Sequence, residues 1–306
     1  MEAAVTENII EEQHVTTADS IRAYYQLTKP GITQMVVVTA AAGYYLSIRD
    51  VAYFTSIQNL FHFVIAMLGT ALISSGACTL NMYLERYDDG LMKRTKNRPI
   101  PSGIISPVHA LIFGVITSVL GALFLGYINM LTLGLALVTH LSYIALYTPL
   151  KKKTWFAMVL GGIPGALPAM GGWTAGLNSV DAGAWIIFLI MFIWQMPHFL
   201  ALAIMYRKDY EQGGFVLLGN QENGSTISAK HLLIYVLVLI PVGLSLTYFG
   251  ITGYLYLLGS LLLSGYLLYS AIILIQSTTV VNARKTLLAS YAYLMGLFIF
   301  MFVDKL

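Results

Sequence analysis

Three oxygen-bearing side chains recur every four residues in one segment of the chain, as Asn81, Glu85 and Asp89. On a helix these side chains share one face and drift by about 40° per step. Carboxylate and amide oxygens suit Mg²⁺, which proteins usually hold through one or two carboxylates together with substrate phosphates and water. The spacing therefore predicts a magnesium site that receives a phosphate compound.

Basic side chains follow this acidic segment at positions 93, 94, 96 and 98, and a second basic group stands at 151–153. Lysine neutralises phosphate charge, and arginine binds two phosphate oxygens at a time. Such charges can instead fix only the orientation of a membrane protein. The acidic residues in register favour binding for the first group, and both interpretations stay open for the second. The candidate phosphate ligands are Lys93, Arg94, Arg98, Lys151, Lys152 and Lys208.

A second set of polar residues lies inside an apolar run, in Trp194-Gln195-Met196-Pro197-His198. Gln195 and His198 need polar partners or a ligand there. His198 either hydrogen-bonds to a neighbour or binds haem iron, a metal that histidine ligates, and both alternatives stay open. Asp209 follows eleven residues after His198, so a regular helix would place both on one face, about 16 Å apart.

The composition indicates where these residues work. Of 306 residues, 58% are hydrophobic and 10% are charged, whereas soluble chains have about 45–50% apolar and about 25% charged residues. This difference indicates a membrane protein. A net charge of +3 without a basic, aromatic-rich stripe speaks against nucleic-acid binding, and the single Cys78 excludes a disulfide within one chain. Because residues 1–24 lack a basic and apolar leader, we expect a disordered cytoplasmic tail before a membrane domain at 25–306.

Apolar runs near the roughly 20 residues that cross a bilayer recur nine times. They predict an all-α, polytopic membrane fold. The predicted spans are Ile32–Leu46, Leu60–Leu84, Pro107–Ile128, Leu131–Tyr147, Phe156–Ala175, Ala184–Met205, Leu232–Phe249, Tyr254–Gln276 and Leu287–Val303.

The positive charges test this count. With nine spans, 15 of the 17 Lys and Arg residues fall on one side of the membrane. Loops rich in Lys and Arg face the cytoplasm, so we expect the N-terminus inside and the C-terminus outside. The long polar loops at 85–106 and 207–230 then share the cytoplasmic face, where they would cover one site.

These segments together resemble the membrane prenyltransferases of the UbiA superfamily, and within it the protohaem IX farnesyltransferase branch. The resemblance runs from Leu27 to about Gly213. Its most specific stretches are Lys93-Arg94-Thr95-Lys96-Asn97-Arg98-Pro99 and Trp194-Gln195-Met196-Pro197-His198-Phe199 continuing to Asp209-Tyr210, and the run Gly165 to Trp173 also fits.

The resemblance implies nine helices around a central cavity and an Mg²⁺-dependent reaction. A farnesyl group would pass from farnesyl diphosphate to the 2-vinyl group of haem B (protohaem IX), which gives haem O. Haem B is then a substrate and not a cofactor. The product would serve haem A and terminal-oxidase biosynthesis, so haem A synthase is an expected partner, and the location is the cell membrane with the active site on the cytoplasmic side.

The family's functional positions carry over residue by residue. The acidic motifs imply that Asn81, Glu85, Asp89 and Asp209 are metal ligands and catalytic residues. Arg94 and Arg98 fall on basic partner positions, and Lys151 and Lys152 on a later basic pair. The candidate haem contacts are Trp194, Gln195 and His198.

The chain departs from the family pattern in its first acidic motif. Aspartate is expected where Glu85 and Tyr87 stand, while Asp88 adds a carboxylate one residue later. Three alternatives stay open: a UbiA-type prenyltransferase with another aromatic or tetrapyrrole acceptor, a transporter, and a catalytically silent haem-binding assembly factor. Charges that cluster at one face, and not at the bilayer midplane, argue against a transporter.

Overall fold

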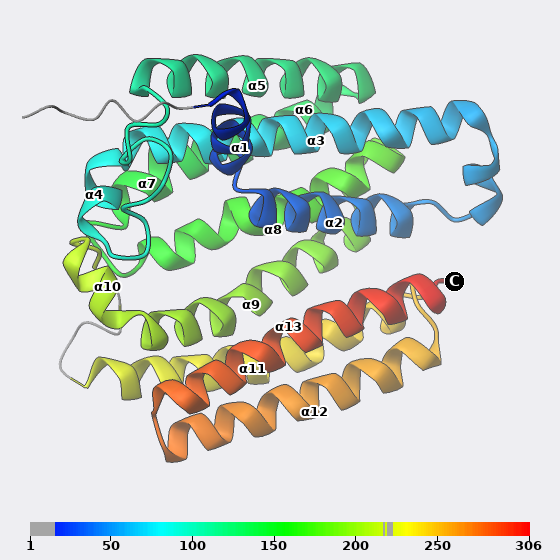
Figure 1. Ribbon diagram of the computed structural model, residues 1–306. Helices are drawn as coiled ribbons and strands as arrows, with labels where there is room; N and C mark the ends of the chain where they lie inside the picture. The colour runs from blue at the N-terminus through cyan, green and yellow to red at the C-terminus, as the bar shows by residue number, and fades with distance from the viewer. Residues whose placement is uncertain (1–15, 217, 219–222) are drawn as a thin grey trace, which may run out of the picture.

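Each predicted apolar run is helical in the computed structural model, which describes residues 16–216, 218 and 223–306 (Figure 1). A helix satisfies its own backbone hydrogen bonds, which hydrocarbon cannot do. The rod Met130–Leu150 combines α6 (Met130–Leu141), the π-helical η2 (Ser142–Tyr147) and α7 (Thr148–Leu150). The other long helices are α2 (Pro30–Ser47), α3 (Ile57–Leu84), α5 (Pro107–Ile128), α8 (Ala157–Leu177), α9 (Ala182–Met205), α11 (Gly224–Tyr248), α12 (Tyr254–Gln276) and α13 (Val280–Val303).

Seven of these helices are long and apolar enough to cross a membrane: α3, α5, the Met130–Leu150 rod, α9, α11, α12 and α13. The chain is therefore an integral, multi-pass membrane protein. α2 and α8 coincide with the predicted spans Ile32–Leu46 and Phe156–Ala175 but are not among the seven. The sequence of α8 is rich in glycine and contains Pro164 and Pro168.

The prediction of a disordered tail over residues 1–24 is wrong from Thr17 onward. Residues 1–15 lie outside the described part of the chain, but Thr17–Leu27 forms α1. A capping box between Thr16 and Asp19 starts this helix by satisfying backbone N–H groups at its first turn. Ala23 and Leu27 are buried among residues of α3 and the loop before α5, so α1 is part of the packed structure.

The short helices α4 (Arg86–Leu91) and α10 (Arg207–Gln212) lie with α7 at one end of the bundle (Figure 1). The regular helix expected to join His198 to Asp209 is broken, because α9 ends at Met205 and Tyr206 has non-helical backbone angles. Asp209 therefore lies on a separate helix at the end of the bundle, and the expectation of one shared face does not hold.

α2 packs against α8 at glycine contacts. A Cβ added to Gly172 would overlap the carbonyl oxygen of Ala40, and a Cβ added to Gly43 would overlap that of Ala169. Small residues of this kind let two membrane helices approach closely. The contact holds α2 against α8 beside the cavity described below.

Gly172→Ala should destabilise the protein through this contact. Overpacking costs about 1–3 kcal/mol, more than the roughly 1 kcal/mol that alanine gains over glycine in a helix. Gly171→Ala is the matched control, since nothing lies within 4 Å of its added Cβ. Thermal unfolding in detergent should show a lower midpoint for Gly172→Ala than for Gly171→Ala, and equal midpoints would contradict the packing argument.

Candidate functional site

The acidic segment lies where α3 ends and α4 begins. Glu85 stands at the junction with non-helical backbone angles, yet its amide donates to the Asn81 carbonyl and its carbonyl accepts from the Asp89 amide. These bonds keep the four-residue register across the break. All three side chains are buried, and the Asn81 side-chain amide donates to the Glu85 carboxylate at 2.6 Å. The structure thus brings Asn81 and Glu85 into direct contact.

The two buried carboxylates are paired with basic side chains from other segments. Lys151, directly after α7, forms an ion pair with Glu85. Arg98, in the loop after α4, binds Asp89 at 2.6 Å. A buried charge is strongly destabilising without a partner, so these pairs hold both segments against the end of α3. They also set two cations beside two carboxylates, a pattern that a metal-bound diphosphate could enter.

Lys29 completes this cluster, and sequence analysis did not select it. Its ammonium group donates to the Asn81 amide oxygen at 2.5 Å. Lys29 has a left-handed backbone conformation (φ 45°) at the bend between α1 and α2, which is uncommon outside glycine, and Pro30 disfavours a helical residue before it. A lysine next to a helix-starting proline at the membrane edge is the signal that could have identified it.

Burial affects both lysines of the cluster. It lowers the pKa of Lys29 and of Lys151 below the ordinary value for lysine, and the negative charge of Glu85 offsets part of this effect at Lys151. Both ammonium groups therefore have little water around them. An approaching anion would stabilise their charged form.

The cluster fits a divalent cation. Asp89 Oδ1 is buried without a hydrogen-bond partner, while Oδ2 binds Arg98. Buried polar atoms normally have a partner, and a carboxylate oxygen suits Mg²⁺. No three His, Cys, Asp or Glu side chains converge on a full metal site within residues 16–216, 218 and 223–306. Mg²⁺ held by Asp89 and Glu85 would take further ligands from substrate phosphate and water, as is usual for this ion.

Two predicted phosphate ligands lie on the loop after α4 and face outward. Lys93 and Arg94 are exposed. The Arg94 guanidinium lies 5.7 and 5.8 Å from the ring centroids of Tyr206 and Tyr210, and such cation–π contacts link this loop to α10. The two long polar loops that were predicted to share a face therefore do meet.

Lys208 and Asp209 lie on α10, apart from the buried cluster. Lys208 is exposed and Asp209 is half-buried. In the part of the chain that the structure describes, Asp209 does not converge with Glu85 and Asp89 into a group of three side chains that could hold a metal ion. Its role as a metal ligand stays a prediction.

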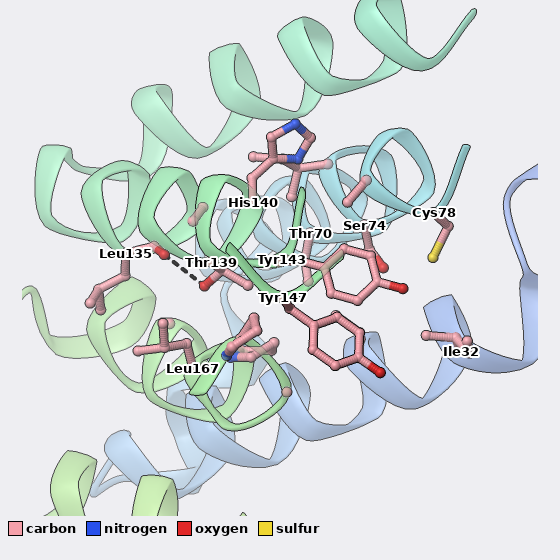
Figure 2. Close-up of a pocket in the computed structure, with 18 of the residues that line it drawn as sticks. Ile32, Thr70, Ser74, Cys78, Leu135, Thr139, His140, Tyr143, Tyr147 and Leu167 are labelled. Atoms are coloured by element: carbon pink, nitrogen blue, oxygen red, sulfur yellow. Dashed lines mark hydrogen bonds between the residues drawn. The ribbon is translucent and has the colours of Figure 1, made fainter. Parts of the chain in front are cut away.

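A mostly apolar cavity of about 330 Å³ opens next to the cluster, with walls from α2, α3, the Met130–Leu150 rod, α8 and α9 (Figure 2). The Lys151 ammonium lies 5.8 Å from the ring centroid of Tyr147, which lines the cavity. The charged cluster therefore stands at one end of an apolar chamber. Gln195 also lines the cavity, and its side-chain amide donates to the Gly162 carbonyl at 2.6 Å.

Trp194 and His198 lie on the other side of α9, against α13. The Trp194 indole donates to the Ser290 carbonyl at 2.7 Å, and His198 Nδ1 lies 3.0 Å from the Ser290 hydroxyl. Their rings stack with centroids 5.2 Å apart, and neither residue lines the cavity. Both have partners inside the protein, so their contact with haem stays a prediction.

The π-helical turn η2 supplies the aromatic wall beside the cluster. Tyr143 and Tyr147 are stacked with ring centroids 5.6 Å apart and 22° between planes, and both line the cavity (Figure 2). π-Helical turns are rare and frequent at functional sites. Nothing in the sequence around these tyrosines distinguishes a π-turn from ordinary helix.

Comparison with known proteins gives relatives over nearly the whole chain. The UbiA prenyltransferase family model matches residues 36–301. The protoheme IX farnesyltransferase of Solibacter usitatus is 38% identical over 93% of this chain and 99% of its own length. That of Myxococcus xanthus is 39% identical over 91% of this chain and 93% of its own length.

Solved structures show the same fold at lower identity. A digeranylgeranylglyceryl phosphate synthase has a TM-score of 0.77 at 16% identity and covers 93% of this chain and 98% of its own. A UbiA homologue from Archaeoglobus fulgidus, solved with GPP and Mg²⁺, has a TM-score of 0.60 at 16% identity and covers 92% of this chain and 100% of its own. These likenesses establish the fold.

Lys151→Arg should raise the pH at which the site loses affinity for an anion. Because the pKa of Lys151 is lowered by burial, the wild-type side chain loses its charge as pH rises through that lowered pKa, whereas arginine stays charged. The pKa of Lys29 is lowered too, so Lys29→Arg combined with Lys151→Arg should extend the shift. Binding of inorganic diphosphate across the alkaline range checks this, with the exposed Lys153→Arg as control. An unchanged alkaline limb in Lys151→Arg would contradict it.

Proposed function

The chain belongs to the UbiA prenyltransferase family, and from this premise we propose that it transfers a farnesyl group from farnesyl diphosphate to the 2-vinyl group of protohaem IX (haem B), which yields haem O. The observation that carries the proposal is the junction of a buried cluster of cations and carboxylates with an apolar cavity. The cluster suits a diphosphate, and the cavity suits a prenyl chain. The names of the relatives at 38 and 39% identity support haem as the acceptor.

Lys29, Arg98 and Lys151 are the side chains that we assign to the diphosphate. In the structure, these three side chains contact side-chain oxygens of the acidic segment. Mg²⁺ bound to those oxygens would add positive charge that stabilises the leaving diphosphate, and the homologue solved with GPP and Mg²⁺ supports this use of the metal. The basic side chains could then turn to phosphate oxygens. Lys93, Arg94, Lys152 and Lys208 remain predicted ligands of the same anion.

The cavity is assigned to the farnesyl chain and the reacting end of the haem. Apolar walls exclude bulk water, which would otherwise consume a reactive cation. As the allylic C–O bond breaks, positive charge grows on the carbon next to the diphosphate. The stacked faces of Tyr143 and Tyr147 lie beside this end of the cavity, where aromatic rings stabilise cationic charge.

We assign nine spans, with the N-terminus in the cytoplasm and the C-terminus outside. The support is the placement of 15 of the 17 Lys and Arg residues on one side. Under this assignment the protein lies in the plasma membrane, and its charged cluster faces the cytoplasm. Haem O would then be available to haem A synthase in the same bilayer.

Purified protein given farnesyl diphosphate, haem B and Mg²⁺ should form a farnesylated haem that is absent when either substrate is left out. Chromatography coupled to mass spectrometry detects the product. A parallel reaction with 4-hydroxybenzoate tests the aromatic acceptors of other UbiA-type enzymes. A product formed only with the aromatic acid, or no product with either acceptor, would refute the proposed function.

Asp89→Asn should slow haem farnesylation on the order of 100-fold, the effect of removing one charge-stabilising group from an active site. The amide keeps an oxygen for Arg98 but removes the negative charge of the unpaired Oδ1. Asp88→Asn is the matched control, because it removes the same charge from the neighbouring residue, which pairs with Lys152 at 2.6 Å. Rates measured against Mg²⁺ concentration should show a raised requirement in Asp89→Asn, and an unchanged requirement in a folded protein would remove Asp89 from the metal site.

A further inference from the structure

The proposed reaction forms a second carbocation, on the haem vinyl group, which must react further to give a stable product. When a vinyl group attacks an allylic carbon, positive charge moves to the neighbouring carbon of that vinyl group. This cation either takes a water molecule and becomes an alcohol, or loses a proton and becomes an alkene. An apolar cavity that excludes water would by itself favour the alkene. The alcohol, which is the proposed product, therefore requires a held water molecule.

One wall of the cavity carries polar groups in a line. Thr70, Ser74 and Cys78 line the cavity from α3 at four-residue spacing (Figure 2), about 6 Å apart along the helix. This line leads toward Asn81 on the same helix. Ser74 lies roughly 10 Å from Asn81 along the axis, whereas Thr70 lies roughly 16 Å away, which sets Ser74 nearer to the reacting carbons.

The hydrogen bonds around Ser74 fix the direction of its proton. The Thr33 hydroxyl donates to the Thr28 carbonyl at 2.8 Å, and the oxygens of Thr33 and Ser74 lie 3.2 Å apart. A hydroxyl has one proton, so Ser74 donates to Thr33. Ser74 Oγ has two lone pairs, and its other hydrogen-bonding neighbour is the Cys78 thiol, so one lone pair remains as an acceptor beside the cavity.

Three other polar side chains of the cavity wall, Thr70, Thr139 and Cys78, are less suited to this role. The hydroxyls of Thr70 and Thr139 donate to carbonyls of their own helices, at 2.9 Å and 2.7 Å. The thiol of Cys78 is a weak acceptor. The Ser74 hydroxyl, in contrast, is bound to Thr33 on a second helix, α2.

We propose that Ser74, oriented by Thr33, positions the water molecule that adds to the vinyl-derived cation, and this inference rests on the proposed function. A water that donates one O–H to Ser74 Oγ turns its own lone pair into the cavity. The allylic C–O bond breaks, a C–C bond forms to the terminal vinyl carbon, and the water oxygen bonds to the neighbouring carbon. The proton released from that water passes to the departing diphosphate, which kept the electron pair of the broken bond.

The ratio of alcohol to alkene in the haem product tests this role. Ser74→Ala should lower the ratio roughly five- to tenfold, the factor that one hydrogen bond is worth, while Ser74→Thr, which keeps a hydroxyl, should restore it. Thr33→Val should lower it as well, because the proton of Ser74 is then free to point at the water. Mass spectrometry separates the two products, since the alkene is lighter by one water.

Ser75→Ala is the matched control, because Ser75 adjoins Ser74 on α3 but does not line the cavity; its product ratio and rate should equal those of the wild type. An unchanged ratio in both Ser74→Ala and Thr33→Val would overturn the positioning role, while formation of farnesylated haem by the wild type would leave the proposed function intact. A wild type that yields neither alcohol nor alkene would instead refute the proposed function. Isotopically labelled water must appear in the hydroxyl of the wild-type product, and its absence there would also exclude the proposal.

Discussion

Neutralisation of two carboxylates that are removed from water is the constraint on which the site depends. Glu85 and Asp89 are buried, and burial of an unpaired charge costs several kcal/mol. Their partners, Lys151 and Arg98, come from segments on different elements. The end of α3 can therefore be buried only if the end of the Met130–Leu150 rod and the loop after α4 close onto it. Folding thus assembles the proposed diphosphate site, because the cations that neutralise these carboxylates are those that a bound anion would use.

One helix connects this charged cluster to the apolar chamber. The Met130–Leu150 rod lines the cavity with Tyr143 and Tyr147, and Lys151 follows directly after it. The π-turn sets the two rings face to face, and the next turn carries the ammonium group into contact with Glu85. The position of the charge relative to the aromatic wall is therefore fixed by a few residues of backbone. In the proposed reaction, departure of the diphosphate at the cluster would leave the cationic carbon beside those rings.

Sequence reasoning identified the helices and the acidic register because both depend on spacing along one element. The runs of apolar residues and the spacing of positions 81, 85 and 89 can be recognised without knowing which elements pack against one another. Lys29 was not predicted to belong to the site, because it reaches Asn81 only through a left-handed bend of the backbone. His198 was ambiguous for the same reason: periodicity does not tell which face of α9 meets α13 and which meets the cavity. The break at Tyr206 and the helix α1 depend on local backbone geometry and capping, which an apolar pattern does not report.

The altered acidic motif redistributes charge without losing it. Tyr87, where an aspartate was expected, is exposed, and its ring lies 4.5 Å from the Arg86 guanidinium, so position 87 points away from the buried cluster. Asp88 instead pairs with Lys152. Glu85 has a longer side chain than the expected aspartate and contacts both Asn81 and Lys151. Glu85 and Asp88 therefore pair with the two adjacent lysines after the rod. Asp89 pairs with Arg98 and keeps one oxygen without a hydrogen-bond partner.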